Sequence, residues 1–237
     1  MNKLKRITWP QLVLLFGVPT LLNFLACRVA IPYLDGLNIL PIEVVYFICV
    51  GILVLLPMFA GSLYLSGKEI GSYRLKEILA RMRVKGLSQI DALWTVVTFI
   101  FLVLSSYLVA KVLMPKFAMD ATPFFFQNMP LSDEYHWVLY PWIIFFFFNI
   151  FGEEFLWRGY IQPRQELLTG KWTWLVHGLF WAGWHIPMGI DLIIAASPIF
   201  FILPAIVQYR KNTTIAIIVH TIFGTFGFLA LALGAVH

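Results

Sequence analysis

Glutamate and histidine side chains occur inside three of the most apolar stretches of this chain. Glu153 and Glu154 follow a run dominated by isoleucine and phenylalanine, and Arg158 comes one helical turn later. His185 and His220 lie in two later apolar stretches. An ionisable side chain within a membrane-spanning helix costs roughly 3 kcal/mol or more unless it is paired or hydrated. These residues are therefore the first candidates for a functional site.

Carboxylate and imidazole groups together are sufficient to hydrolyse an amide. The carboxylate takes a proton from water, and the imidazoles hold that water or bind a metal. Arginine, asparagine or imidazolium groups stabilise the oxyanion that forms. A serine or cysteine nucleophile is not needed, and Ser197 beside Pro198 has no neighbouring base. The zinc-protease pattern H-E-x-x-H is absent from the sequence.

The two adjacent glutamates are expected to have different roles. Neighbouring residues on a helix point about 100° apart. Glu154 and Arg158 are separated by four residues in the favoured order, which predicts an ion pair that keeps Glu154 charged. Glu153 is then left to face a cavity and accept a proton. The alternative is that both glutamates are ordinary interface charges and that the histidines are hydrogen-bonded packing residues.

The surrounding elements must be membrane helices. The chain has 237 residues, of which 60% are hydrophobic and only 12% are charged, and its mean hydropathy is +0.83. Soluble domains carry about 25% charged residues. Cys27 and Cys49 lie in apolar stretches and suggest neither a disulfide framework nor a metal motif. The composition therefore excludes a water-soluble enzyme, and the net charge of +5 does not indicate nucleic-acid binding.

The predicted fold is an all-α, polytopic membrane helix bundle that forms a single domain over residues 1–237. A bilayer core about 30 Å thick needs roughly 20 apolar helical residues. The fourth helix is expected to continue to about residue 167, and Pro187 to end the fifth. Residues 117–134, with Phe124–Phe126 at the interface, offer an eighth element. The seven predicted spans are 10–33, 43–66, 90–114, 136–157, 172–188, 190–208 and 213–236.

The distribution of charge gives this span list an orientation. With a cytoplasmic N-terminus, all but three of the 17 lysines and arginines fall on the inner side; the exceptions are Arg28, Lys111 and Lys116. The basic loop at 68–85 is expected to lie against anionic lipid. No cleavable signal peptide or targeting sequence is evident, and loops are short. We therefore expect an integral protein of the bacterial inner membrane with its N-terminus inside and its C-terminus outside.

Three motifs resemble those of the CAAX protease and bacteriocin-processing family, also called Abi proteins. Glu153 to Gly159 is similar to the family's E-E-x-x-x-R motif, and Trp181 to His185 to its aromatic-x-x-x-H motif. His220 falls where the histidine of the third motif is expected. The order and spacing agree over roughly residues 140–228, within a family-like catalytic core at about 136–236.

This resemblance implies an intramembrane endopeptidase, similar to type II CAAX prenyl proteases, that cleaves a membrane-tethered or lipidated peptide. Glu153 would activate water with support from Glu154 and Arg158, and His185 and His220 would complete the water and oxyanion site. The type is glutamic or metallo. If a divalent metal such as zinc is bound, its ligands would be Glu153, His185 and His220, but the resemblance is equally compatible with no metal. No nucleic acid is expected as a partner, and the oligomeric state is not indicated.

One position departs from the family pattern. The third motif usually has Asn or Asp four residues after the histidine, and this chain has Gly224. Other candidates for substrate or oxyanion contacts are Asn149, Trp181, Thr221 and Thr225. The departure keeps open a catalytically weak or inactive membrane partner, such as a bacteriocin-immunity protein. Buried Glu and His residues also occur in proton-coupled transporters, although no inverted repeat is evident.

Overall fold

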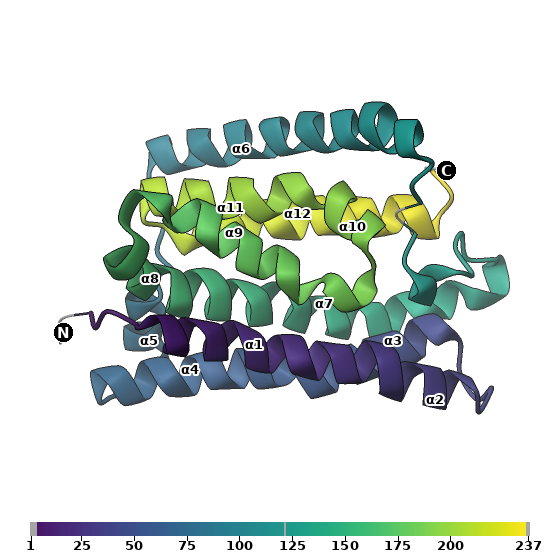
Figure 1. The fold of residues 1–237 in the computed structure, drawn as a ribbon, viewed down its shortest axis with the longest axis horizontal. Helices are drawn as coiled ribbons and strands as arrows, with labels where there is room; N and C mark the ends of the chain where they lie inside the picture. The colour runs from purple at the N-terminus through teal and green to yellow at the C-terminus, as the bar shows by residue number, and fades with distance from the viewer. Residues whose placement is uncertain (1–3, 121, 236–237) are drawn as a thin grey trace.

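The protein is an all-α bundle, as predicted. The computed structural model describes residues 4–120 and 122–235, and no β-strand occurs among them. The long helices run back and forth along one axis, so that the N-terminal and C-terminal parts of the chain lie at opposite ends of the bundle (Figure 1). In chain order the α-helices are α1 (Trp9–Leu25), α2 (Ile31–Asp35), α3 (Ile42–Val50), α4 (Leu56–Ile70), α5 (Leu75–Arg81), α6 (Gln89–Leu108), α7 (Leu139–Glu153), α8 (Gln162–Thr169), α9 (Thr173–Trp184), α10 (Ile190–Ala195), α11 (Ser197–Arg210) and α12 (Thr213–Ala232).

Four of the long rods contain, within the described residues, a stretch of wider π-helix. These stretches are Ala26–Ala30 between α1 and α2, Gly51–Leu55 between α3 and α4, Val109–Leu113 after α6, and Glu154–Ile161 between α7 and α8. Short π-helical segments inside α-helices often occur at functional sites. The last of the four stretches begins at the second glutamate of the pair. The predicted continuation of the fourth helix is confirmed, because α8 ends at Thr169.

Within the described part of the chain, five helical stretches are long and apolar enough to cross a membrane. They are Trp9–Asp35, Ile42–Ile70, Gln89–Phe117, Asp133–Trp184 and Thr213–Ala232. The fourth stretch contains both the fourth and the fifth predicted spans, with a reversal of direction between α8 and α9 near Gly170, whose φ is 55° (Figure 1). The chain is therefore an integral membrane helix bundle.

The fifth and sixth predicted spans are shorter than expected. α9 has 12 residues and α11 has 14, so at 1.5 Å per residue both fall short of a core about 30 Å thick. α9 already ends at Trp184, one turn before Pro187. A 3₁₀-helical turn follows it at Ile186–Met188 and is ended by Gly189, whose φ is 117°. These two helices pack against each other in the middle of the bundle.

The described residues of 117–134 do not form an eighth span. They contain only short 3₁₀-helices or parts of them, one of which is Phe124–Phe126. Phe125 is buried, and its ring stacks on Tyr46 with the centroids 3.6 Å apart. The sequence suggested that this phenylalanine lies in the membrane interface. The structure shows that it packs in the protein core.

The basic segment at 68–85 is also more internal than predicted. Arg81 is buried and its Nη2 lies 2.5 Å from Glu69 Oε1. Arg83 makes two hydrogen bonds, of 2.8 and 2.9 Å, with the carboxylate of Glu166 on α8. These arginines join α5 and its loop to neighbouring helices. Only part of the positive charge of this segment is available to lipid.

Candidate active site

The paired glutamates lie at the junction of α7 and the π-helical stretch, deep in the bundle. Gly152 precedes them, and a Cβ at this position would lie 2.7 Å from the backbone oxygen of Leu55. The glycine therefore allows α7 to approach the rod of α3 and α4 closely. Glu153 is the last residue of α7, and Glu154 is the first residue of the wider helix. The two carboxylates consequently point toward different neighbours.

Glu153 is enclosed and held by two hydrogen bonds. Asn149 Nδ2, one turn earlier on α7, donates to Oε1 at 2.7 Å. The indole Nε1–H of Trp181 on α9 donates to Oε2 at 2.7 Å. The side chain is only 2% exposed. The expectation that this carboxylate faces an open cavity is therefore wrong for this conformation, because both of its oxygens contact protein donors.

Glu154 forms the predicted pair with Arg158, with Oε1 3.2 Å from Nη1. The same oxygen lies 2.8 Å from Nδ1 of His220 on α12. Both members of the ion pair are fully buried. Removing charges from water is expensive, and here each charge is offset by its partner. The Glu154–Arg158 prediction is confirmed, and the structure adds His220 to the pair.

Trp181 is the centre around which these groups gather. The guanidinium carbon of Arg158 lies 3.4 Å from the centroid of its ring, a cation–π contact. The imidazoles of His185 and His220 pack against the same indole in edge orientation, with centroid separations of 6.1 and 5.8 Å. Gly178, one turn earlier, allows this part of α9 to approach α11. The tertiary structure thus brings four of the predicted catalytic residues, Glu153, Arg158, His185 and His220, into contact with one tryptophan.

The hydrogen bonds define the tautomers of the two histidines. Nδ1 of His185 lies 3.0 Å from the carbonyl oxygen of Trp181, which can only accept, so Nδ1 carries the proton. Nδ1 of His220 donates in the same way to Glu154. Among the residues that the structure describes, no hydrogen bond engages either Nε2. In its neutral form, each ring offers Nε2 as its basic atom.

The glycine in the third motif is explained by packing. A Cβ at Gly224 would lie 3.1 Å from the ring of Phe146 on α7. This phenylalanine lies beside the backbone from which the family's Asn or Asp would extend. Thr221 donates its hydroxyl hydrogen to Ile217 of its own helix at 2.7 Å, and no hydrogen bond joins Thr225 to another described residue. Asn149 is therefore the candidate amide that the structure brings to the carboxylates.

A buried polar row, which was not among the predicted site residues, extends from Arg158 along the same rod. Gln162 and Gln165 are fully buried. Nδ1 of His177 on α9 lies 2.8 Å from Oε1 of Gln165. The spacing of four residues from the second glutamate to Arg158, and of four more to Gln162, was a signal for this row. Only the bundle could show that His177 completes it.

The residues do not form a ready-made metal site. Within residues 4–120 and 122–235, no group of three or more His, Cys, Asp or Glu side chains is placed to hold a metal ion. The proposed ligand set of Glu153, His185 and His220 is not among such groups in this arrangement, and both oxygens of Glu153 already accept from protein donors.

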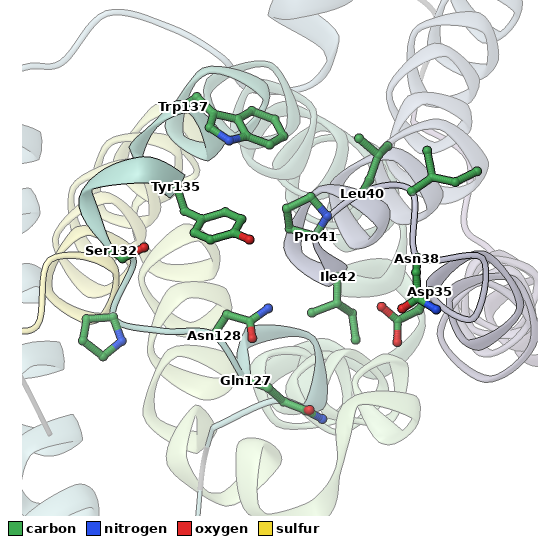
Figure 2. A pocket seen from close by; sticks show the side chains of 12 residues that line it. Asp35, Asn38, Leu40, Pro41, Ile42, Gln127, Asn128, Ser132, Tyr135 and Trp137 are labelled. Carbon is green, nitrogen blue, oxygen red and sulfur yellow. The ribbon is translucent and has the colours of Figure 1, made fainter.

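A pocket of about 660 Å³ lies away from this site, at the end of the bundle opposite the N-terminus. It is formed by the turn between α2 and α3 and by the segment before α7, and the Tyr135 hydroxyl points into it (Figure 2). Asn128, which lines the pocket, donates from its backbone and side chain to buried Glu43 at 3.2 and 3.3 Å. None of the predicted catalytic residues lines this pocket.

The helices surround a buried Glu–His cluster inside an apolar bundle. Residues 135–226 match the family model described as type II CAAX prenyl endopeptidase Rce1-like. The segment from just before α7 into α12 is therefore similar to this protease family, and the predicted resemblance is confirmed over these residues. No curated protein and no solved structure matches the chain.

Proposed function

We propose that the protein is an intramembrane endopeptidase that hydrolyses a peptide bond of a membrane-associated substrate with a water activated by glutamate and histidine. The observation that carries this proposal is the convergence of Glu153, His185 and His220 on Trp181, with Glu154 joined to the group through His220. Four ionisable groups from three parts of the sequence meet in an apolar interior, where each has a high cost. Clusters of this kind, with specific partners, are typical of catalytic sites.

Glu153 is the residue we assign as the base, in agreement with the family resemblance. A carboxylate has about four lone-pair sites, and Asn149 and Trp181 occupy two. A water bound to a remaining site would lose a proton to Glu153 as its oxygen adds to the carbonyl carbon. The same proton would then pass to the leaving nitrogen. Trp181 and Asn149 act as positioning residues that fix the direction of the carboxylate.

The imidazoles are assigned to the water and the oxyanion. Nε2 of His185 is available to accept from the attacking water. When His220 enters the reaction already protonated at both ring nitrogens, the carboxylate of Glu154 compensates its charge, and Nε2–H donates to the oxyanion and keeps its proton. Arg158 keeps Glu154 charged and so supports this role indirectly. No step requires a metal ion.

The substrate we propose is a peptide or protein tethered to the membrane, for example by a lipid. The site lies among long apolar helices, and a tethered substrate is held at the same depth. We further propose that the N-terminus is cytoplasmic and that the membrane is the bacterial inner membrane. The supports are the positive charge of the end that carries α5 and α8 and the scarcity of long loops.

The test is cleavage of a farnesylated CAAX peptide and of a non-lipidated membrane-anchored peptide by the purified protein in nanodiscs. Glu153→Gln, His185→Ala and His220→Ala should each reduce cleavage at least a hundredfold, in the range seen when a general base is lost. Glu134→Gln and His136→Ala, which lie outside the site, are the matched controls. Each variant should retain the wild-type helical circular dichroism spectrum.

Retention of activity in folded Glu153→Gln protein would refute the proposed mechanism. Retention of a biological phenotype by the same variant would favour a non-catalytic membrane partner. Glutamate-dependent uptake of a solute into proteoliposomes would favour a transporter.

A further inference from the structure

A basic pocket of about 400 Å³ lies at the N-terminal end of the bundle, between the start of α1 and the ends of α4 and the α7–α8 rod. Lys5 and Arg6 form part of its wall, together with Tyr160, Arg164 and Glu69. Lys5 and Arg6 are exposed, whereas Arg164 is only 2% exposed. The pocket therefore combines accessible cations with a buried one.

The single carboxylate in this pocket does not cancel its positive charge. Glu69 is hydrogen bonded to Arg81 through Oε1 and to Arg164 through Oε2. One negative charge thus faces two guanidinium groups. Arg164 also lies over the ring of Tyr160, with its guanidinium carbon 3.8 Å from the centroid, which fixes its position. With Lys5 and Arg6 included, the pocket has a clear excess of positive charge and suits an anion.

An apolar groove continues from this pocket into the membrane-spanning region. Leu14 and Leu15 line the basic pocket and also line a second hollow of about 310 Å³. The other walls of this hollow include Val18 on α1 and Met58 and Gly61 on α4. The groove therefore follows α1 and α4 away from the basic end and toward the middle of the bundle. Its surface is almost entirely apolar.

We infer that this composite site binds one anionic phospholipid. The headgroup phosphate lies against Lys5, Arg6 and Arg164, and an acyl chain occupies the groove between α1 and α4. The negative headgroup matches the positive charge of the pocket. The acyl chain joined to it matches the apolar groove that follows the pocket along α1 and α4. Basic pockets between membrane helices are known headgroup sites. The inference is independent of the proposed peptidase function.

The site is separate from the catalytic cluster. None of the proposed catalytic residues lines either hollow. A lipidated peptide that must present its scissile bond to Glu153 therefore has no evident reason to use this groove. A resident lipid needs only the anionic end and the apolar wall, and both are present.

The experiment is native mass spectrometry of the full chain exchanged into phosphatidylcholine nanodiscs that contain graded amounts of phosphatidylglycerol. One phosphatidylglycerol molecule should remain bound to the wild-type protein after release from the nanodisc. Lys5→Gln combined with Arg6→Gln should weaken binding about 30-fold, since each cation near a membrane surface contributes about fivefold. Arg74→Gln combined with Lys76→Gln removes two exposed cations outside the pocket and should leave binding within about twofold.

A second pair of variants tests the groove. A Cβ at Gly61 meets no atom within 4 Å, so Gly61→Leu fills the hollow without disturbing the backbone. Gly17 on α1 is equally open but lies in a different hollow, lined also by α9, and Gly17→Leu is the matched control. Gly61→Leu should reduce retained phosphatidylglycerol at least tenfold, and Gly17→Leu should not.

Three results would overturn the inference. An equal loss of phosphatidylglycerol binding in the Lys5→Gln/Arg6→Gln and Arg74→Gln/Lys76→Gln variants would show only a general attraction of the lipid to surface charge. Binding of glycerol phosphate as tight as that of phosphatidylglycerol would show an anion site without an acyl groove. Displacement of phosphatidylglycerol by a farnesylated peptide, at equal concentration and only when the peptide carboxylate is free, would assign the groove to substrate.

Discussion

Replacing Arg158 by methionine should destabilise the fold strongly. Arg158 and Glu154 are both 0% exposed, and their closest N–O separation is 3.2 Å. At this separation and an effective dielectric constant of about 20, their attraction is about 5 kcal/mol. Removing one member of a buried pair costs about 3–5 kcal/mol, because the other charge stays buried without compensation. We expect Arg158→Met to lower the free energy of unfolding by this amount.

The double variant Glu154→Gln/Arg158→Met separates charge from packing. Glutamine still offers His220 an oxygen acceptor but carries no charge, so the double variant should recover most of the lost stability. Unfolding of the wild type, both single variants and the double variant in mixed micelles, by titration with a denaturing detergent, gives the coupling energy. A coupling energy below about 0.5 kcal/mol, or an Arg158→Met protein as stable as the wild type, would refute the buried-pair argument.

Three further variants test the architecture of the site. Trp181→Phe keeps an aromatic ring but loses the indole donor to the α7 carboxylate, so cleavage should slow roughly tenfold to a hundredfold; an unchanged turnover number would contradict the positioning role. Gly178→Ala places a Cβ 2.7 Å from a backbone oxygen of α11 and should lower the thermal midpoint by several degrees, whereas Gly183→Ala, with no atom within 4 Å, should not. Gly224→Asn should be destabilising alone, because its Cβ lies 3.1 Å from Phe146, and should be tolerated with Phe146→Ala; equal midpoints for the single and double variants in a thermal scan would argue against this contact.

The predicted and observed partners of the glutamates agree where the interaction is local. Glu154 and Arg158 are four residues apart on one rod, so helical spacing alone predicted their pairing. The separate roles of the two glutamates also followed from the rotation per residue. The contacts of Glu153 with Trp181 and of Glu154 with His220 join residues distant in sequence. No local rule selects such partners.

The predicted spans show the same division. Long apolar runs determined α1, the α3–α4 rod, α6, α7 and α12, since a bilayer requires their length and composition. The lengths of α9 and α11 depended on a turn at residues 185–189 and on packing inside the bundle. Neither can be predicted from the hydropathy of the sequence. The predicted position of Phe125 in the interface was wrong for a similar reason. A run of phenylalanines is equally apolar whether it faces lipid or a buried tyrosine.

The amino-acid sequence by itself determined that this is a membrane-embedded helix bundle and which ionisable residues its apolar segments contain. Both conclusions depend on composition and on spacing along a helix. Only the tertiary structure decided that Trp181 is the common neighbour of Glu153, Arg158 and the two histidines. It also decided that Asn149 and Trp181 enclose Glu153 and that Phe146 packs beside Gly224. These features depend on how α7, α9 and α12 are placed against one another. That placement is set by many weak packing contacts and by close approaches at glycines.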